Sequence, residues 1–255
     1  GISMQDQILE ARDASTAERV ASFFNEVWSG AEVAPFDLML AAQHAGGYLH
    51  YTESDGVISA ASFGFLGSRS GASILHSHVT ASKIAGLGYS LKQHQFEWAR
   101  LRGITGVTWT FDPLVRRNCV FNFVKLGAIG VEYLPNFYGA MTDAINFGDE
   151  SDRLLAYVDL GQGQTSPTPA TDFENTALVD RHGRPERVGF DSSQPFWIEL
   201  PSDIETLRRT NLGSALEWRH RVRELLVPAF AEGMWVTRMN DSRTAFQVAN
   251  PTAHR

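Results

Sequence analysis

Residues 72–92 read ASILHSHVTASKIAGLGYSLK, and this stretch decides the fold. Its first part, 72–80, has the composition of a β-strand. A turn at 83–88 carries Gly86 and Gly88, and the pattern after it predicts a helix that continues to about residue 102 and ends at Gly103. We therefore expect a strand, a glycine turn and a helix in direct succession.

A turn of this kind can bind an anion. Glycines let the backbone approach a ligand closely, and the free N–H groups at a helix start favour a negative charge, so a pyrophosphate is the natural guest. The alternative is that Gly86 and Gly88 only form a tight turn. The segment is not the G-x-G-x-x-G dinucleotide fingerprint, because Leu91 occupies the third glycine position. It is not a P-loop either, because no Gly-Lys-Ser/Thr follows.

The rest of the chain alternates helices and strands around this unit. In the first part we expect strands at 7–12, 48–53, 57–66, 72–80, 104–111, 128–134 and 153–160, and helices at 16–29, from Pro35 to Gly46, from the turn to about 102, and at 116–126. Ser15 or Thr16 is expected to cap the first helix. After a polar linker, we expect a hairpin at 177–189, a strand at 196–200, a helix at 203–231 and a final hairpin over 234–248.

Composition excludes several classes of protein. The chain has 255 residues, of which 43% are hydrophobic and 20% charged, so it is globular rather than disordered. Its net charge of -7 and the lack of a basic face argue against nucleic-acid binding, and no apolar run is long enough for a membrane helix. One cysteine, Cys119, excludes a disulfide framework. The N-terminal residues show no secretion signal, so we expect a cytoplasmic protein, and the preference for arginine over lysine suggests a bacterial one.

The motifs resemble those of the GNAT acyl-CoA N-acyltransferase superfamily. Its signature, Arg/Gln-x-x-Gly-x-Gly/Ala after the fourth strand, stands here as Lys83-Ile-Ala-Gly-Leu-Gly88, and 122–128 resembles a later helix end of the superfamily. The stretches 76–79, 109–113, 134–139 and 151–154 are similar to a bacterial subgroup of predicted acetyltransferases.

The resemblance implies an α+β fold with a mixed, mostly antiparallel central sheet flanked by helices. It covers an acyltransferase domain over 1–160, which a linker at 161–175 joins to a smaller α+β extension. The extension, 176–255, is expected to pack on the first domain, because its apolar residues are too numerous to leave in water.

The function that the resemblance implies is transfer of an acyl group, acetyl by default, from acyl-CoA to the amine of a small molecule. The residues it assigns to the acyl-CoA site are Val79, Lys83, Ile84, Ala85, Gly86, Leu87, Gly88, Tyr89, Ser90, Asn118 and Asn122. Two departures from the pattern, Lys83 for Arg or Gln and Phe123 for a proton-donating tyrosine, leave open a non-catalytic CoA-binding or sensing domain. A fold without a CoA site and a homodimer are also left open.

Proton transfer needs further side chains. His76 and His78 alternate on the strand before the turn and are candidates for the base that deprotonates the amine. Glu132, Tyr133 and Tyr138 end or follow a later strand, and a tyrosine there can replace the missing acid. The alternatives are structural histidines, a His-x-His metal pair and packing tyrosines; no third ligand stands out, so we expect no metal.

Three other groups have competing interpretations. Asp112 either holds an acceptor amine or forms the turn before Pro113. Cys119 has no accompanying oxyanion motif, so an acyl-enzyme is disfavoured. Arg219, Arg221 and Arg223 alternate with glutamates, which predicts paired charges on a solvated helix face.

Overall fold

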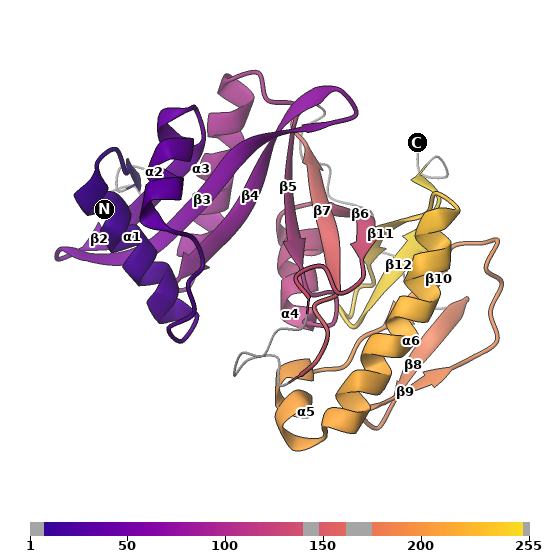
Figure 1. Ribbon diagram of the computed structural model, residues 1–255. Coiled ribbons are helices and arrows are strands. Elements are labelled where there is room, and N and C mark those ends of the chain that lie inside the picture. Colours follow the sequence, from indigo (N-terminus) through magenta and orange to yellow (C-terminus); the bar gives the residue numbers. More distant parts are fainter. Residues whose placement is uncertain (1–7, 140–147, 162–174, 252–255) are drawn as a thin grey trace. The chain divides into compact units, whose positions relative to one another are not determined.

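The computed structural model describes residues 8–139, 148–161 and 175–251, and its contacts group the chain into two compact units (Figure 1). The first unit comprises Gly1–Trp109 and Asp159–Gly163, and the second comprises Thr110–Val158 and Gln164–Arg255. The boundary between them lies inside strand β5 (Gly106–Phe111) rather than near residue 160. The segment 110–158 therefore packs with the C-terminal part of the chain.

The strands of the first unit follow the order β1-β2-β3-β4-β5. The first four are β1 (Ile8–Glu10), β2 (Tyr48–Ser54), β3 (Val57–Arg69) and β4 (Ala72–Ser82). They pair antiparallel, and β4 then pairs parallel with β5 from Ile74↔Gly106 to His76↔Thr108. Strand register in this unit confirms a mixed, mostly antiparallel sheet.

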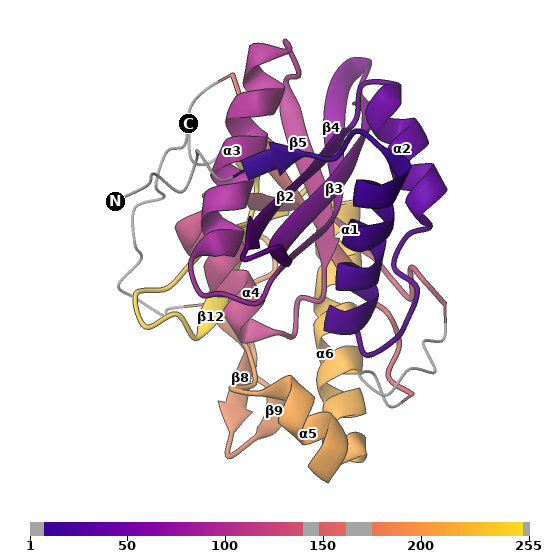
Figure 2. The ribbon, with the colours of Figure 1, turned by 90° about the vertical axis from the view of Figure 1, so that its left-hand side faces the viewer.

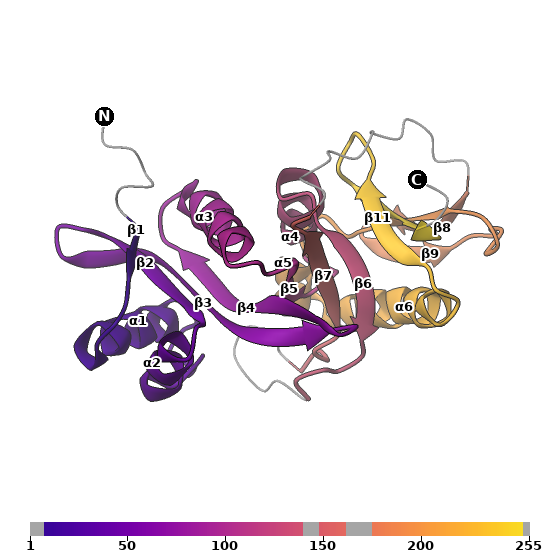
Figure 3. The same cartoon turned by 90° about the horizontal axis from the view of Figure 1, so that it is seen from above.

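Helices cover both faces of this sheet. Helices α1 (Ala14–Val27) and α2 (Phe36–His44) lie on one face, and α3 (Leu87–Leu101) lies on the other (Figure 2, Figure 3). The apolar positions of α1 recur at helical spacing and are buried against the sheet: Ala17, Val20, Phe23 and Phe24. The cap differs from the prediction, because Asp13 Oδ1 accepts from the Thr16 amide at 2.8 Å.

The second unit has its own strand order, β7-β6-β11-β12-β10-β8-β9. Its strands are β6 (Ile129–Leu134), β7 (Arg153–Asp159), β8 (Thr176–Arg181), β9 (Arg184–Arg187), β10 (Phe196–Glu199), β11 (Trp235–Met239) and β12 (Ala245–Ala249). Because β11 pairs with β6, the C-terminal strands continue the sheet that β6 and β7 begin. Val236 faces Gly130, where a larger side chain would meet Leu154 and Val236.

Two predicted helices differ from those observed. The helix expected at 203–231 is two helices, α5 (Ile204–Thr210) and α6 (Leu212–Ala231), because the backbone of Asn211 is not helical (φ -155°, ψ 80°) and its side chain caps the second helix at the Ser214 amide. The helix expected at 116–126 begins as α4 (Arg116–Cys119) and widens into a π-helix, η2 (Val120–Lys125). A π-turn of this kind inserts one extra residue into the helix.

Most of the predicted linker 161–175 lies outside the described residues, which resume at 175. Among the helices of the described ranges, none combines the length and the apolar composition that crossing a bilayer requires.

Candidate functional site

Strand β4 carries an irregularity at His78, in the half of the strand that leads to the glycine turn. Phe63 pairs with Val79 and Gly64 pairs with Ser77, so His78 is an extra residue in the ladder. An extra residue of this kind is a β-bulge, which bends the strand and interrupts its regular pairing. The parallel pairing with β5 ends close by, at His76 and Thr108. The bulge thus immediately precedes Val79, the first residue predicted for the acyl-CoA site, and β4 pairs regularly again from Val79 to Ser82.

The glycine turn connects β4 to α3 in the predicted way. Gly86 is the N-cap of α3 and has a φ of 87°, a conformation that side-chain-bearing residues rarely adopt. Before it, the Ser82 hydroxyl donates to the Ile84 carbonyl and accepts from the Ile84 amide, which fixes the start of the turn. No atom lies within 4 Å of where a Cβ at Gly86 would be, so this side of the turn is open.

The turn leaves several backbone donors unused. Within the part of the chain that the structure describes, the amides of Ala85, Gly86, Gly88 and Tyr89 have no acceptor. The amides of Leu87 and Ser90 bond back to Ile84 and Gly86. A helix start with free N–H groups carries a partial positive charge, and α3 has no side-chain cap and no acidic residue in its first turn.

The side chains predicted for the acyl-CoA site divide by exposure. Leu87 is buried beside Leu91 and Ala60, and Val79 is buried in the core beneath α1 and α2, so these two residues can offer only backbone to a ligand. Ile84 and Tyr89 are exposed. Lys83 is exposed but paired: its Nζ lies 2.8 Å from Glu26 Oε1 and 5.6 Å from the centre of the Phe23 ring.

A cavity of about 380 Å³ lies in the first unit beside the bulge. Residues 33–35 and Leu38 form one wall, and Phe63, Phe65 and His78 form another. Of the two predicted histidines, His78 lines this cavity and His76 does not. His76 Nδ1 lies 2.9 Å from the Thr108 hydroxyl, and burial, with the nearby His78 and Lys92, lowers the pKa of His76 to about 4.

Helix α3 carries a buried lysine, Lys92, that the sequence analysis did not single out, and its ammonium lies against Ser77 of β4. Lys92 is 3% exposed; its Nζ donates to Ser77 Oγ at 3.1 Å and to Gln95 Oε1 at 3.2 Å. The ammonium also lies 3.8 Å from the centre of the Trp109 ring. Burial lowers the pKa of Lys92 to about 7. The sequence held one signal for this buried lysine, because Lys92 lies on the face of α3 that carries its buried residues.

Asn118 and Asn122 belong to the second unit, on α4 and η2. Asn122 is buried, and its carbonyl accepts from the Ala128 amide at 2.9 Å. Phe123 is fully buried, with its ring 5.7 Å from that of Phe111 and 6.3 Å from that of Phe246. Phe123, where the resemblance to the superfamily implies a tyrosine, is thus a core residue of this unit.

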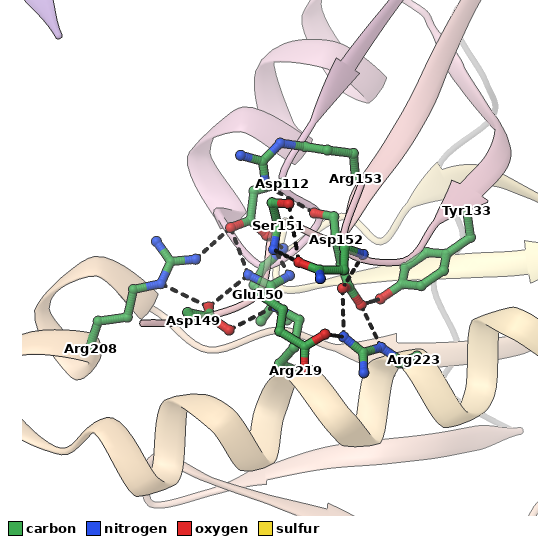
Figure 4. A network of polar contacts seen from close by, with 12 residues as sticks. Asp112, Tyr133, Asp149, Glu150, Ser151, Asp152, Arg153, Arg208, Arg219 and Arg223 are labelled. Carbon is green, nitrogen blue, oxygen red and sulfur yellow. Dashed lines mark hydrogen bonds and ion pairs between the residues drawn. The ribbon is translucent and has the colours of Figure 1, made fainter. Parts of the chain in front are cut away.

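Asp112 is neither an exposed acceptor site nor only a turn residue. It is buried with Asp149 between the guanidinium groups of Arg208 and Arg219, as Figure 4 shows. Arg219 donates to Asp112 at 2.8 and 2.9 Å and to Asp149 at 2.8 and 3.2 Å. Burial disfavours the charged form of Asp112, but the charge of Arg219 outweighs it and holds the pKa of Asp112 well below its usual value.

This network corrects the interpretation of the arginines on α6. Arg219 is 1% exposed and was wrongly expected on a solvated face, whereas Arg221 is exposed and pairs with Glu224 at 3.3 Å. Arg223 bonds to Asp152 and Glu150 on the segment before β7. These ion pairs join α5 and α6 to the ends of β5 and β7, and they have the closed, mutually satisfied character of a structural network.

The predicted acid residues of the second unit have separate surroundings. Tyr133 is buried and its hydroxyl donates to Asp152; burial and the Asp152 charge raise the pKa of Tyr133. Tyr138 is exposed, with its hydroxyl 3.3 Å from Thr110 Oγ1 and the Arg153 guanidinium 5.7 Å from its ring centre. Glu132 lies in β6, at a bulge opposite Leu155. No group of His, Cys, Asp or Glu within the described ranges is arranged to hold a metal ion.

Comparisons with known proteins gave structural likenesses alone. No family model matches the sequence, and no curated protein matches it. Similar solved structures include yncA of Salmonella typhimurium with its cofactor acetyl-CoA, at 17% identity and a TM-score of 0.47, covering 63% of this chain and 96% of that one.

Two further likenesses have names that state an activity. One is an acetyltransferase of the GNAT family from Streptococcus pneumoniae, at 17% identity and a TM-score of 0.48, covering 60% of this chain and 98% of that one. The other is a ribosomal-protein-alanine N-acetyltransferase of Brucella melitensis, at 13% identity and a TM-score of 0.47, covering 60% of this chain and 98% of that one. Each match spans nearly all of the other protein and leaves more than a third of this chain unmatched.

Proposed function

We propose that the chain binds acyl-CoA at the turn between β4 and α3 and transfers the acyl group to an amine. The observation that carries this proposal is the set of unused amides at Ala85, Gly86, Gly88 and Tyr89, at a helix start that is open to solvent. A pyrophosphate has several acceptor oxygens and two negative charges. Backbone donors at a helix N-terminus stabilise such a group without any basic side chain.

Binding by backbone amides alone is compatible with Lys83 at the position where the signature has an arginine or glutamine. The ammonium of Lys83 is shared with Glu26, so it adds little charge at the turn. Binding through backbone amides does not depend on that side chain. The open space at Gly86 supports the same inference, because a bound phosphate would occupy the volume that a Cβ needs.

We place the thioester of acyl-CoA beside the bulge of β4. Pairing between β4 and β5 ends at His76, so the amide-containing arm of CoA can extend along the edge of β4 as an added strand does. A bulge leaves its extra residue outside the regular ladder, and a backbone N–H freed in this way can polarise the thioester carbonyl. His78 is the residue that the bulge inserts and also lines the cavity.

The reaction that follows is a direct transfer. An ammonium first loses a proton, for which His78 is the candidate acceptor; the amine nitrogen then bonds to the acyl carbon as the carbon–sulfur bond breaks. The nitrogen releases a second proton and the thiolate takes one up, giving an amide and CoA thiol. The buried Phe123 cannot supply that proton, so a tyrosine or solvent does.

A second candidate function is CoA binding without catalysis. It is favoured by Phe123, which fills the core where the superfamily has an acid. Under this alternative the chain binds CoA but turns over no amine in the presence of acetyl-CoA. Binding and turnover measured on one preparation distinguish the two functions.

The test is a calorimetric titration of the whole chain with CoA. Gly86→Glu adds bulk and a like charge at the turn, so CoA affinity should fall at least tenfold. Gly103→Glu is the matched control: Gly103 follows the other end of α3, also has a positive φ, of 74°, and has equally open surroundings. Equal affinities of both variants and the parent protein would remove the turn as the binding site.

A further inference from the structure

We infer that the cavity between α2 and strands β3 and β4 receives the apolar body of the acceptor, so that the acceptor is a primary amine with an aromatic or branched aliphatic group and no second charge. This inference rests on the proposed function and names the substrate class of the same site. The volume of about 380 Å³ lies within the range of small-molecule pockets, about 300–1,000 Å³.

The chemistry of the lining decides the class of ligand. Apart from His78, every lining side chain is a hydrocarbon, and none is a carboxylate. A polyamine or an amino sugar would lose water from several charged or hydroxyl groups here and find no partner for them, which is costly. An apolar group instead gains about 25 cal/mol for each Å² that it removes from water.

The rings on one wall favour an aromatic body. The Phe63 ring lies 6.2 Å from that of His78, and the Phe65 ring lies 6.1 Å from it. Rings at these separations interact through edges and faces, and an added ring can join them in the same way. An ammonium close to a phenyl face gains a further attraction before it is deprotonated.

The position of His78 orients the amine. It is the one titratable side chain of the lining, and it comes from the bulge of β4. An amine whose apolar body fills the cavity therefore has its nitrogen held near the imidazole, since no other polar side chain of the lining competes for it. A long acyl chain has no polar group to place beside His78, whereas an amine has one. The acceptor therefore fits this lining better than an acyl chain does.

The experiment measures binding of amines to the whole chain in the absence of CoA. By calorimetry, 2-phenylethylamine should bind at least tenfold more tightly than ethylamine, which lacks the ring, and than spermidine, which carries additional charges. Ala42→Phe, on the cavity side of α2, should fill the space and reduce the affinity for 2-phenylethylamine at least tenfold.

Matched variants control for folding. Ala41→Phe adds the same ring one residue earlier, at an exposed position outside the lining, and should leave binding unchanged. Leu38→Gln keeps the volume of a side chain that is already 56% exposed and removes part of the apolar wall; it should weaken binding about threefold and keep the fold intact.

Two results would overturn the inference. One is equal affinity for 2-phenylethylamine, ethylamine and spermidine. The other is tighter binding of hexanoyl-CoA than of acetyl-CoA by tenfold or more, with Ala42→Phe removing that advantage, because the cavity would then belong to the acyl chain. Selective amine binding by a chain that binds no CoA would contradict the proposed function, and the cavity would then be an amine-binding site without acyl transfer.

Discussion

Arg219 on α6 donates two hydrogen bonds, of 2.8 and 2.9 Å, to Asp112 at the end of β5, although 107 residues separate them. The contact is buried and is shared with Asp149 and Arg208. It makes the C-terminal helices part of the same compact unit as the residues that follow β5. Long-range ion pairs of this kind hold the second unit together.

Removal of Arg219 should destabilise the protein strongly. Arg219→Met removes the guanidinium that bonds to both buried carboxylates and leaves Arg208 to bond to them, and breaking a buried pair typically costs about 3–5 kcal/mol. Arg221→Met, two residues further along the same helix, removes an exposed ion pair and should change the free energy of unfolding by less than about 1 kcal/mol. Urea denaturation of both variants checks this, and similar losses would show that the network is not buried in solution.

The buried Lys92 should make stability rise with pH. Its pKa is lowered to about 7 in the folded protein from 10.5, so the unfolded chain binds more protons between these values. Relative to Lys92→Met, the native protein should therefore gain about 3 kcal/mol of unfolding free energy between pH 7 and pH 10. Denaturation of both proteins across this range measures the difference; a constant difference would mean that the ammonium is solvated.

His50 should contribute to loss of stability in acid. It is buried against Tyr48, with ring centres 4.1 Å apart, and burial, with the charge of His94, lowers the pKa of His50 to about 3. The unfolded chain then binds more protons below about pH 6.5, so stability falls as the pH falls through this range.

The matching variant is His50→Phe, which keeps a ring against Tyr48 and removes the titration. Between pH 7 and pH 4, the free energy of unfolding should fall by about 3 kcal/mol less in this variant than in the native protein. Identical acid transitions for the two proteins would place the sensitive group elsewhere.

The two tyrosines predicted as proton donors should respond differently to loss of the hydroxyl. Tyr133→Phe leaves the buried Asp152 without one donor and should lower the melting temperature. Tyr138 is exposed, so Tyr138→Phe should keep the melting temperature and, if this residue is the acid, reduce turnover about 10²–10⁴-fold. Unchanged turnover in both variants would favour protonation of the thiolate by solvent.

Local signals made the strand, turn and helix of 72–102 predictable. The helical spacing of apolar residues in α1 was equally clear, and that helix is observed. The bulge at His78 was not predictable, because it depends on the register of β4 against β3. Neither was the break at Asn211, where the amide side chain caps a second helix within a continuous helical pattern.

The misassigned Arg219 shows why pattern alone fails at buried charges. Glutamates alternate with the arginines, which is typical of a solvated helix, but the partners of Arg219 lie 70 and 107 residues away in the chain. One signal was present: Arg219 follows Trp218 within the apolar stripe that includes Ala215 and Val222. A charge in such a stripe indicates a buried partner, and the same reasoning would have found Lys92 on α3.

The anion site that we propose at the start of α3 is tested most directly by Gly88→Asp. Gly88 has no positive φ, and an added Cβ would make an ordinary contact with Ser82 at 3.8 Å, so the substitution fits. A carboxylate in the first helical turn stabilises the helix by about 0.3–1 kcal/mol, while it repels a pyrophosphate at the same amides. Titration with CoA together with thermal denaturation should therefore show a melting temperature that is unchanged or raised and a CoA affinity that falls at least tenfold. A variant that binds CoA as tightly as the native protein would contradict the account.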